Sequence, residues 1–442
     1  WSHITIDKNK IMKLATSSPV PAFCLGLLTI LGGVAGYVKK GSISSLAAGL
    51  ILGFLLVISG VLMKKKQYEG NMLALLTSGI MVYAMTGRYL QSRKMMPSGI
   101  VAALGTLSLA YHLKKTLESK STTTAEGTKI SSLRWWQGFF ISSIFSVVYL
   151  LTPAYLISAL LAIFVQFPSK EIAFLYTSPL LLSILFPSKQ MLFLANYMEA
   201  MLDYFDYEEV TEISNEELLN NTSSGKNYIL ALQPHGVISF CSLCSWVKAP
   251  AEVRKVKTGV ASVLLKFPIL KHVMGIYGLT PASSGNIRKI LQRERGIDGS
   301  LVLYIGGIAE LFKSSRKEER LYLKKRKGFI KIALREGADV IPIYLFGNTS
   351  VLTVVKTGLL ASLSRKLQMS LTYFWGQFLL PVPRSEKLLY VRGKPLGLPH
   401  LPEPTEEDID KWHAKYCEEV TRIFESYKEK VPAYKHKTLH MD

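Results

Sequence analysis

Hydrophobic residues fill long uninterrupted segments at the start of the chain. Four such segments lie at about 20–38, 45–63, 71–87 and 97–113, and Lys or Arg residues bound each of them. A helix of this length can just cross a hydrocarbon core of about 30 Å. We therefore predict a four-helix transmembrane domain over residues 14–116, whose flanking charges do not fix its orientation because both ends are positive.

A polar stretch and a second hydrophobic region follow. Residues 117–134 have no apolar period, which is typical of a linker. Residues 135–199 include an uncharged run from Trp135 to Ser169, and prolines at several positions predict broken helices there: Pro153, Pro168, Pro179 and Pro187. We expect a hydrophobic membrane anchor in this region, formed either by a hairpin or by a re-entrant segment.

From about residue 200, short β-like runs alternate with charged, helix-like stretches. The runs read YILAL, GSLVLYI, ADVIPIYLFG and LLYVRG. This order predicts an α/β domain over residues 200–442, with a mostly parallel sheet and covering helices. The last element is an amphipathic helix with a capping box at Thr405 and Asp408, which packs either on this domain or on the bilayer.

Charge and cysteine content narrow the class of partner. The chain is 49% hydrophobic and carries a formal net charge of +21. Such a balance favours nucleic acid, lipid headgroups or an anionic substrate. Because no zinc-finger or RNA-binding signature is present, we expect a lipid surface and a phosphorylated substrate rather than nucleic acid. The lone C-x-x-C at Cys241 and Cys244 lacks further ligands, so we expect no metal. Trp1 in place of Met predicts a fragment or a processed form.

The first candidate for chemistry is a histidine between a proline and a glycine. Pro234, His235 and Gly236 directly follow the β-like run that ends near Leu232. The carboxyl end of a strand is where α/β folds bind ligands. A histidine that is neutral near pH 7 can take a proton from a hydroxyl, although a structural histidine is the alternative.

Two further stretches carry polar or unhindered groups. Gly306 and Gly307 end a predicted strand, and their N–H groups can face an oxyanion or a phosphate. We expect the Glu310 carboxylate to orient the imidazole of His235, or else to pair with a basic residue of the next helix. Arg326 lies at the start of a predicted helix. Its side chain is expected either to be solvated at the surface or to contact the phosphates of an acyl carrier.

These three stretches occur in the order typical of one family. Residues from about 200 to 442 resemble the type 2 diacylglycerol acyltransferase family, which includes monoacylglycerol and wax-alcohol acyltransferases. The matching residues are Pro234-His235-Gly236, Gly306-Gly307-Ile308-Ala309-Glu310, Arg326, Gly328-Phe329, Pro342, Phe346-Gly347 and Val391-Arg392-Gly393-Lys394-Pro395. The stretch from Gly36 to Leu50, GYVKKGSISSLAAGL, resembles the transmembrane protein 14 family, which includes the plastid fatty-acid export proteins.

The resemblance implies a fold, a reaction and a set of site residues. It implies an α/β acyltransferase domain, fused to the all-α transmembrane domain, that moves an acyl group from acyl-CoA to a lipid hydroxyl without a cofactor. His235 would be catalytic and Glu310 its partner. The residues expected to contact substrate are Pro234, Gly236, Gly306, Gly307, Arg326, Gly328, Phe329, Phe346, Gly347 and Asn348.

The acceptor and the location are less closely specified by the resemblance. Diacylglycerol is the expected acceptor. The alternative reactions are wax-ester or phytyl-ester synthesis and acyl transfer to monoacylglycerol. The alternative outside enzymes is a fatty-acid transporter or scaffold with an inactive acyltransferase domain. We expect the protein to lie in the endoplasmic reticulum membrane with its catalytic domain facing the cytosol, and the plastid envelope is the alternative location. A homo-oligomer is also possible on the sequence alone. The family usually has histidine at Gln233 and glutamate at Asn348, so these two amides raise the question of activity.

Overall fold

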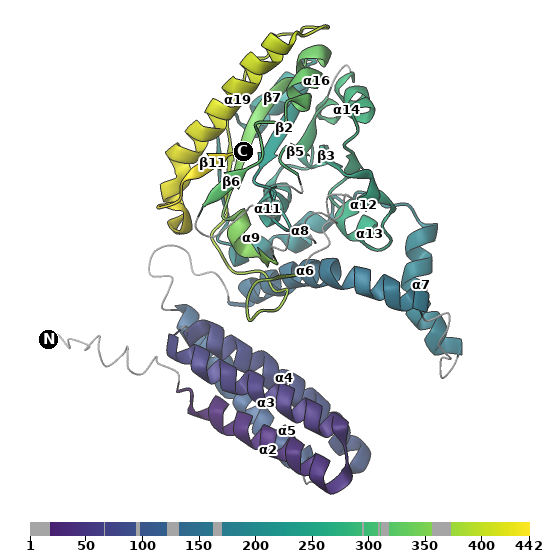
Figure 1. Cartoon of the computed structure of the whole chain (residues 1–442), viewed down its shortest axis with the longest axis vertical. Helices are drawn as coiled ribbons and strands as arrows, with labels where there is room; N and C mark the ends of the chain where they lie inside the picture. The colour runs from purple at the N-terminus through teal and green to yellow at the C-terminus, as the bar shows by residue number, and fades with distance from the viewer. Residues whose placement is uncertain are drawn as a thin grey trace, which may run out of the picture. The chain divides into compact units, whose positions relative to one another are not determined.

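The computed structural model of the chain describes residues 18–65, 67–93, 98–121, 132–161, 170–293, 296–307, 310, 318–355 and 373–442. The chain forms two compact units, Trp1–Ser132 and Leu133–Asp442, and each is described by itself (Figure 1).

The first unit contains the four predicted helices. They are α2 (Val20–Lys40), α3 (Ile43–Lys65), α4 (Gln67–Ser92) and α5 (Ile100–Ser121). Two of them, over Val20–Val38 and Ser45–Met63, are long and apolar enough to cross a membrane. In α4 and α5, buried polar side chains pair with one another: His112 Nδ1 lies 3.0 Å from Asn71 Oδ1, and the hydroxyls of Ser78 and Ser108 lie 2.9 Å apart.

Helix occupies both ends of the predicted linker at 117–134. The helix α5 continues to Ser121, and α6 (Ser132–Leu161) begins before the predicted boundary. The middle of that linker, 122–131, lies outside the described residues. The regions predicted separately as anchor and α/β domain both fall within the second unit, Leu133–Asp442.

The hydrophobic region of the second unit folds as two helices, α6 and α7 (Lys170–Leu185). Within α6, Arg134–Leu160 is a third segment long and apolar enough to cross a membrane. Contrary to the predicted breaks, Pro153 and Pro179 lie inside these helices. Pro187 follows the end of α7, and Pro168 lies outside the described residues. An apolar helix tolerates an internal proline when neighbouring groups satisfy the freed backbone carbonyl.

Close contacts hold α6 against the rest of this unit. The Nε of Arg134 lies 2.7 Å from Oδ2 of Asp203. A Cβ at Gly138 would lie 2.1 Å from the carbonyl oxygen of Ala200, so only glycine permits this approach. The candidate membrane helix is therefore packed directly on the domain that follows it.

A seven-stranded sheet forms the centre of that domain, in the order β1-β10-β7-β2-β5-β3-β4. The strands are β1 (Glu208–Thr211), β2 (Tyr228–Gln233), β3 (Lys257–Val260), β4 (Leu279–Pro281), β5 (Leu301–Tyr304), β7 (Asp339–Phe346) and β10 (Leu389–Arg392). Neighbours pair in parallel except β10 and β7, which are antiparallel. The predicted α/β domain with a mostly parallel sheet is confirmed in part. The antiparallel pair of β10 and β7 was not predicted, because the alternation of strands and helices along the chain does not show strand direction.

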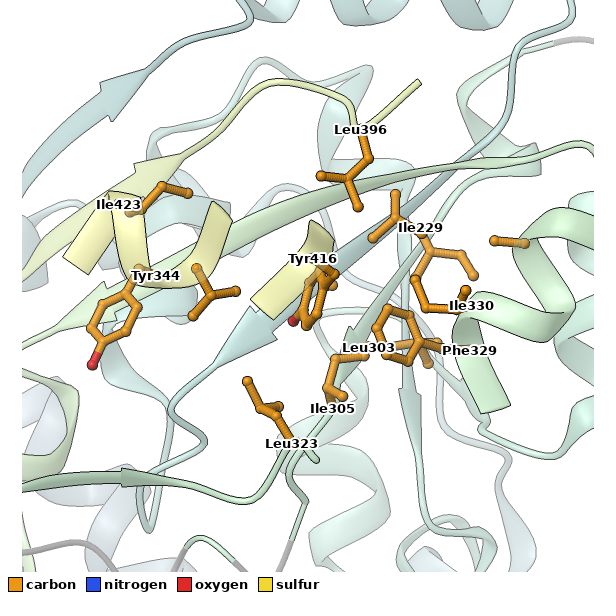
Figure 2. Packing of buried hydrophobic residues seen from close by; sticks show 14 of the residues in the cluster. Ile229, Leu303, Ile305, Leu323, Phe329, Ile330, Tyr344, Leu396, Tyr416 and Ile423 are labelled. Carbon is orange, nitrogen blue, oxygen red and sulfur yellow. The ribbon is translucent and has the colours of Figure 1, made fainter. Parts of the chain in front are cut away.

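One face of the sheet carries the hydrophobic core, under α16 (Gly328–Glu336) and α19 (Glu406–Tyr427). Alternate strand residues such as Ile229 and Leu303 point to this face and pack against Ile330 and Tyr416, as Figure 2 shows. Helix α16 ends at Gly337, whose φ of 67° is the left-handed conformation that glycine adopts most easily.

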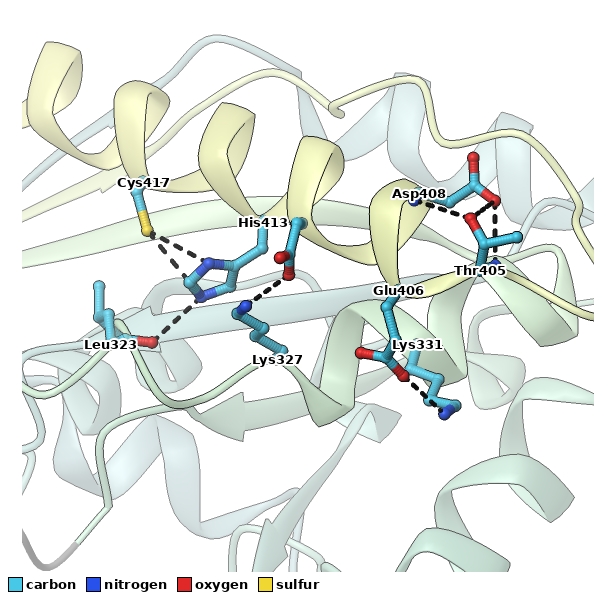
Figure 3. A network of polar contacts seen from close by, with 9 residues as sticks. Leu323, Lys327, Lys331, Thr405, Glu406, Asp408, His413 and Cys417 are labelled. Carbon is cyan, nitrogen blue, oxygen red and sulfur yellow. Dashed lines mark hydrogen bonds and ion pairs between the residues drawn. The ribbon is translucent and has the colours of Figure 1, made fainter.

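The last helix, α19, packs on the α/β domain, which was one of the two predicted alternatives; the other was packing on the bilayer. The capping box at Thr405 and Asp408 is present. Figure 3 shows its hydrogen bonds together with the ion pairs Lys327–Asp410 and Lys331–Glu406, which join α16 to α19. The exposed ion pairs contribute little individually, so the buried apolar face of α19 supplies most of its attachment.

Candidate active site

The histidine singled out in the sequence lies at the carboxyl edge of the sheet. His235 follows β2 and precedes α11 (Phe240–Lys248), with Gly236 at a φ of 65° completing the turn. A Cβ at Gly236 would lie 2.7 Å from Nδ2 of Asn348, so the turn has no room for a larger residue.

Two features of its surroundings favour a neutral His235 with a defined tautomer. Its Nδ1 lies 2.7 Å from the carbonyl oxygen of Gly236, and because a carbonyl only accepts, Nδ1 carries the proton. The Nε2 atom is then the proton-accepting nitrogen. Burial lowers the pKa of His235 below its usual 6.5, outweighing the carbonyl contact that raises it, so the ring is neutral at pH 7.

The side chain of Asn348 fixes the turn that carries His235. Its Nδ2 donates to the carbonyl oxygens of Pro234 at 3.1 Å and of His235 at 2.8 Å. It also lies 3.3 Å from Oγ of Ser239, and its Oδ1 accepts from the backbone N–H of Cys241 at 3.3 Å. The amide is only 2% exposed, so these bonds are shielded from water. A neutral amide can donate and accept at once, and Asn348 does both here.

The carboxylate of Glu310 holds the backbone of His235, whereas we expected it to orient the imidazole. Its Oε2 accepts from the His235 N–H at 3.0 Å, and its Oε1 accepts from the Tyr322 N–H at 3.1 Å. Burial raises the pKa of Glu310 to about 7, although both backbone donors oppose that rise. The residue therefore sets the position of the histidine rather than its tautomer.

His235 lines a cavity of about 460 Å³ between the sheet and α11. The walls come from alternate strand residues that point away from the core, such as Leu230 and Leu232 of β2 and Val302 and Tyr304 of β5. The rings of His235 and Tyr304 have centroids 4.6 Å apart. Most of the lining is apolar, which suits a lipid chain.

The same cavity touches the candidate membrane helix α6. Tyr149 of α6 lines it, and Phe145 of α6 lies 6.0 Å, centroid to centroid, from Tyr277, another lining residue. At another part of the lining, Arg326 is exposed to solvent. The lining thus includes a residue of an apolar helix and an exposed basic residue.

The structure separates the predicted site residues into three groups. His235, Gly307 and Arg326 line the cavity. Pro234, Gly236, Gly306, Glu310 and Asn348 lie around the histidine turn, where a Cβ at Gly306 would lie 2.0 Å from Glu310 Oε1. Although we expected substrate contact from Pro234, Gly236, Gly306 and Asn348, none of these four lines the cavity. The last four predicted contacts do not line it either: Gly328, Phe329, Phe346 and Gly347.

Those four residues have other surroundings. Phe329 and Phe346 are buried in the core on the opposite face of the sheet, and their rings contact Tyr416 and Phe424. Gly328 begins α16, and Gly347 turns the chain after β7 with a φ of 84°.

Several cavity residues were not predicted from the sequence. They are Ser239, Ser242 and Ser245 near one face of α11, together with Tyr304, Tyr390 and Arg392 of the strands. The spacing of three between the serines is a usable helix signal. Of the two amides in question, Gln233 lies outside the cavity lining: its Oε1 accepts from the Tyr416 hydroxyl at 2.6 Å, and its Nε2 has no partner among the described residues.

The two cysteines of the C-x-x-C motif are buried and unbonded in α11. Within the part of the chain that the structure describes, no group of His, Cys, Asp and Glu side chains has the arrangement to hold a metal ion.

The sheet, the apolar cavity and the histidine at the strand edge define a membrane-associated α/β protein with a candidate acid–base site. The model of the family described as diacylglycerol acyltransferase matches residues 163–442, and that described as transmembrane proteins 14C matches residues 21–112. The first match covers more than half of the sequence. The chain therefore belongs to the diacylglycerol acyltransferase family, and its N-terminal helices carry a second, separate family match.

Curated relatives agree with this assignment. Human Diacylglycerol O-acyltransferase 2 is 30% identical over 251 residues, which cover 52% of this chain and 63% of the relative. The Dictyostelium discoideum protein of the same name is 30% identical over 245 residues, 51% of this chain and 72% of the relative. Mouse Acyl-CoA wax alcohol acyltransferase 1 is 29% identical over 241 residues, 50% of this chain and 72% of the relative. The chain thus spans less than two thirds of the human relative, and no solved structure matches it significantly.

Proposed function

We propose that this chain is a membrane-bound O-acyltransferase that moves an acyl group from acyl-CoA to a lipid hydroxyl, with diacylglycerol as acceptor and triacylglycerol as product. The observation that carries the proposal is a neutral histidine, His235, at the edge of an apolar cavity that also touches the candidate membrane helix α6. Membership of the diacylglycerol acyltransferase family supports the same reaction.

The proposed reaction begins with proton transfer to His235. Its Nε2 takes the proton of the acceptor hydroxyl, while Nδ1–H stays bonded to the Gly236 carbonyl. The alkoxide oxygen attacks the thioester carbonyl carbon and forms a C–O bond. When the tetrahedral intermediate collapses, the C–S bond breaks, and the imidazolium gives its proton to the departing CoA thiolate, which leaves as the thiol and returns His235 to its neutral form. No atom of the protein becomes acylated.

The surrounding groups suit this sequence of charges. Glu310 and Asn348 hold the backbone of His235 from two sides, so the ring is positioned before substrate arrives. Gly307 lines the cavity without a side chain, and its N–H is a candidate donor to the oxyanion. Such donors lower a barrier by about 3–4 kcal/mol in comparable sites. Arg326, exposed beside the cavity, is placed to meet the phosphates of CoA.

A second acceptor class has its own support. The wax-alcohol relative at 29% identity makes a long-chain alcohol a candidate acceptor in place of diacylglycerol. The apolar lining accommodates either chain, so the lining alone does not distinguish them.

For the location of the protein, we propose the endoplasmic reticulum membrane, with the α/β domain facing the cytosol. This orientation would give the domain access to the cytosolic acyl-CoA pool, and the three apolar helices supply the membrane attachment. For the N-terminal helices, whose residues 21–112 match transmembrane proteins 14C, we propose delivery of fatty acids to the active site, on the ground of their fusion to this domain.

The proposal is tested by expressing the full chain in yeast that cannot make triacylglycerol. Wild type should restore neutral lipid, and His235→Ala at equal protein level should not. Thin-layer separation after labelling with acyl-CoA identifies triacylglycerol or wax ester. Neutral lipid that appears with both proteins, or with neither, would speak for a transporter or scaffold with a silent domain.

A further inference from the structure

The apolar cavity has a polar region away from the catalytic histidine. Ser239, Ser242 and Ser245 all line it, and they follow one another at a spacing of three. At a rise of 1.5 Å per residue, hydroxyls at the two ends of such a row are about 9 Å apart along the helix axis. Tyr304, beside His235, lies close to the side chains of the first two serines. A row of hydroxyls therefore leads away from the catalytic ring.

An arginine lies at the far end of this row. Tyr390 and Arg392 are two residues apart on β10, so both point to the cavity face of the sheet. The Tyr390 hydroxyl lies close to the side chains of Ser245 and Arg392. Arg392 is only 4% exposed. A charge so well shielded inside an apolar cavity is costly unless it has partners.

The partners of Arg392 leave part of its donor capacity available. One terminal nitrogen donates to the carbonyl oxygen of Ile213 at 3.3 Å, and the other lies 3.5 Å from Oε1 of Glu209. These contacts are long, and a guanidinium has five N–H donors. Because Glu209 balances the charge, the group that best completes the cluster is a neutral hydrogen-bond acceptor, not an anion.

We infer that Arg392, Tyr390 and Ser245 form an acceptor subsite that binds an ester carbonyl of diacylglycerol and so selects it over a long-chain alcohol. The inference rests on the proposed function. Five covalent bonds separate the free hydroxyl oxygen of diacylglycerol from the carbonyl oxygen of the adjacent ester. Five extended bonds are about 6 Å long, so with a hydrogen bond of about 2.8 Å at each end the ligand reaches up to about 12 Å, which is enough to cover the serine row.

The selectivity follows from what each acceptor presents to the subsite. Diacylglycerol offers a carbonyl to the donors of Arg392 and Tyr390. A saturated alcohol places methylene groups there and leaves those donors without an acceptor. Sites built to bond a polar group discriminate strongly against a ligand that lacks it, because the buried donors are then unpaired.

The test is a competition between two acceptors, with the full chain in microsomes of the same yeast. Labelled oleoyl-CoA is supplied with equal amounts of dioleoylglycerol and hexadecanol, and the ratio of triacylglycerol to wax ester is measured. Wild type should favour triacylglycerol. The double variant Arg392→Met/Glu209→Gln removes both charges and leaves neither buried alone. Its ratio should fall tenfold or more, through loss of triacylglycerol with wax ester maintained.

Two further variants keep the result interpretable. Tyr390→Phe removes only a hydroxyl, and its ratio should fall several-fold even if the double variant folds poorly. Arg422→Met removes an exposed arginine that pairs with Glu212, outside the cavity, and should keep the wild-type ratio. A wild type that favours wax ester, or variants that make both esters in the wild-type ratio, overturns the subsite. Wild type that makes no ester from either acceptor refutes the proposed function instead.

Discussion

Replacing the amide of Asn348 by a carboxylate should disable the histidine turn in a pH-dependent way. In Asn348→Asp, an oxygen takes the place of the Nδ2 that lies 2.8 Å from the His235 carbonyl oxygen and 3.1 Å from that of Pro234. An ionised carboxylate cannot donate to either carbonyl and is repelled by both. The variant side chain must therefore bind a proton or move.

The magnitude follows from the cost of that proton. An aspartate with an ordinary pKa of about 3.9 needs about 4 kcal/mol to stay protonated at pH 7, since each pH unit corresponds to about 1.4 kcal/mol. Leaving one buried carbonyl unpaired costs about 1–3 kcal/mol, so displacing the side chain from both carbonyls costs about 2–6 kcal/mol, similar to the cost of the proton. The folded-state pKa of the new carboxyl is raised. Its penalty is therefore small below pH 4 and grows as pH rises toward neutrality.

The assay compares acyl transfer and thermal unfolding of variant and wild type between pH 6 and 8. Per folded molecule, kcat/KM of Asn348→Asp should be about 100-fold lower at pH 7.5, because a misplaced base loses rate steeply, and the deficit should shrink toward pH 6. Asn227→Asp is a matched control. Asn227 also donates to two carbonyls, at 2.7 Å each, and is 6% exposed, but it precedes β2 at the opposite end from His235.

The control should lose stability with the same pH dependence and keep its kcat/KM per folded molecule. Equal losses of kcat/KM in the two variants would show that Asn348 matters only for folding. Full activity of Asn348→Asp at pH 8 would refute the positioning argument altogether.

Three further predictions concern the site and the hydrophobic core on the other face of the sheet. Because burial lowers the pKa of His235 below 6.5, kcat/KM should stay level down to about pH 6.5 and then fall tenfold per unit below the lowered pKa; a pH–rate profile with its acid limb centred above 6.5 contradicts this. Gly306→Ala should destabilise the protein by about 1–3 kcal/mol, since the added Cβ would lie 2.0 Å from Glu310 Oε1, whereas Gly285→Ala, with nothing within 4 Å, should not; thermal unfolding measures both. Ile330→Ala, at a fully buried position, should cost about 2–5 kcal/mol in the same measurement without changing the pH–rate profile, and a changed profile would show that the core and the site are coupled.

The family departures at Gln233 and Asn348 have different consequences. Gln233 is buried beneath Tyr416 on the core side of β2, so its amide does not alter the cavity lining. Asn348 bonds directly to the turn, where an amide donates to two carbonyls without a proton. Glutamine at 233 and asparagine at 348 both leave His235 and its bond to the Gly236 carbonyl in place. We therefore favour an active enzyme over a scaffold without catalytic activity.

Local pattern determined the elements of this protein. The apolar segments, the capping box at Thr405 and the glycine at 337 predict helices that the structure contains, and the β-like runs predict β2, β5, β7 and β10. His235 on a turn after β2 was also evident, because a strand, a proline and a glycine follow one another within a few residues. Such signals depend on neighbours along the chain.

Tertiary structure decided which of these residues meet. All six residues of β2 are buried, so the strand shows no alternation that would distinguish its cavity face from its core face. The contacts of His235 with Glu310 and Asn348 span 75 and 113 positions, and Arg392 lies on the cavity face because of the register in which β10 pairs with β7. Sequence spacing carries little information about such distant partners, because their approach is set by strand order and helix packing rather than by local period.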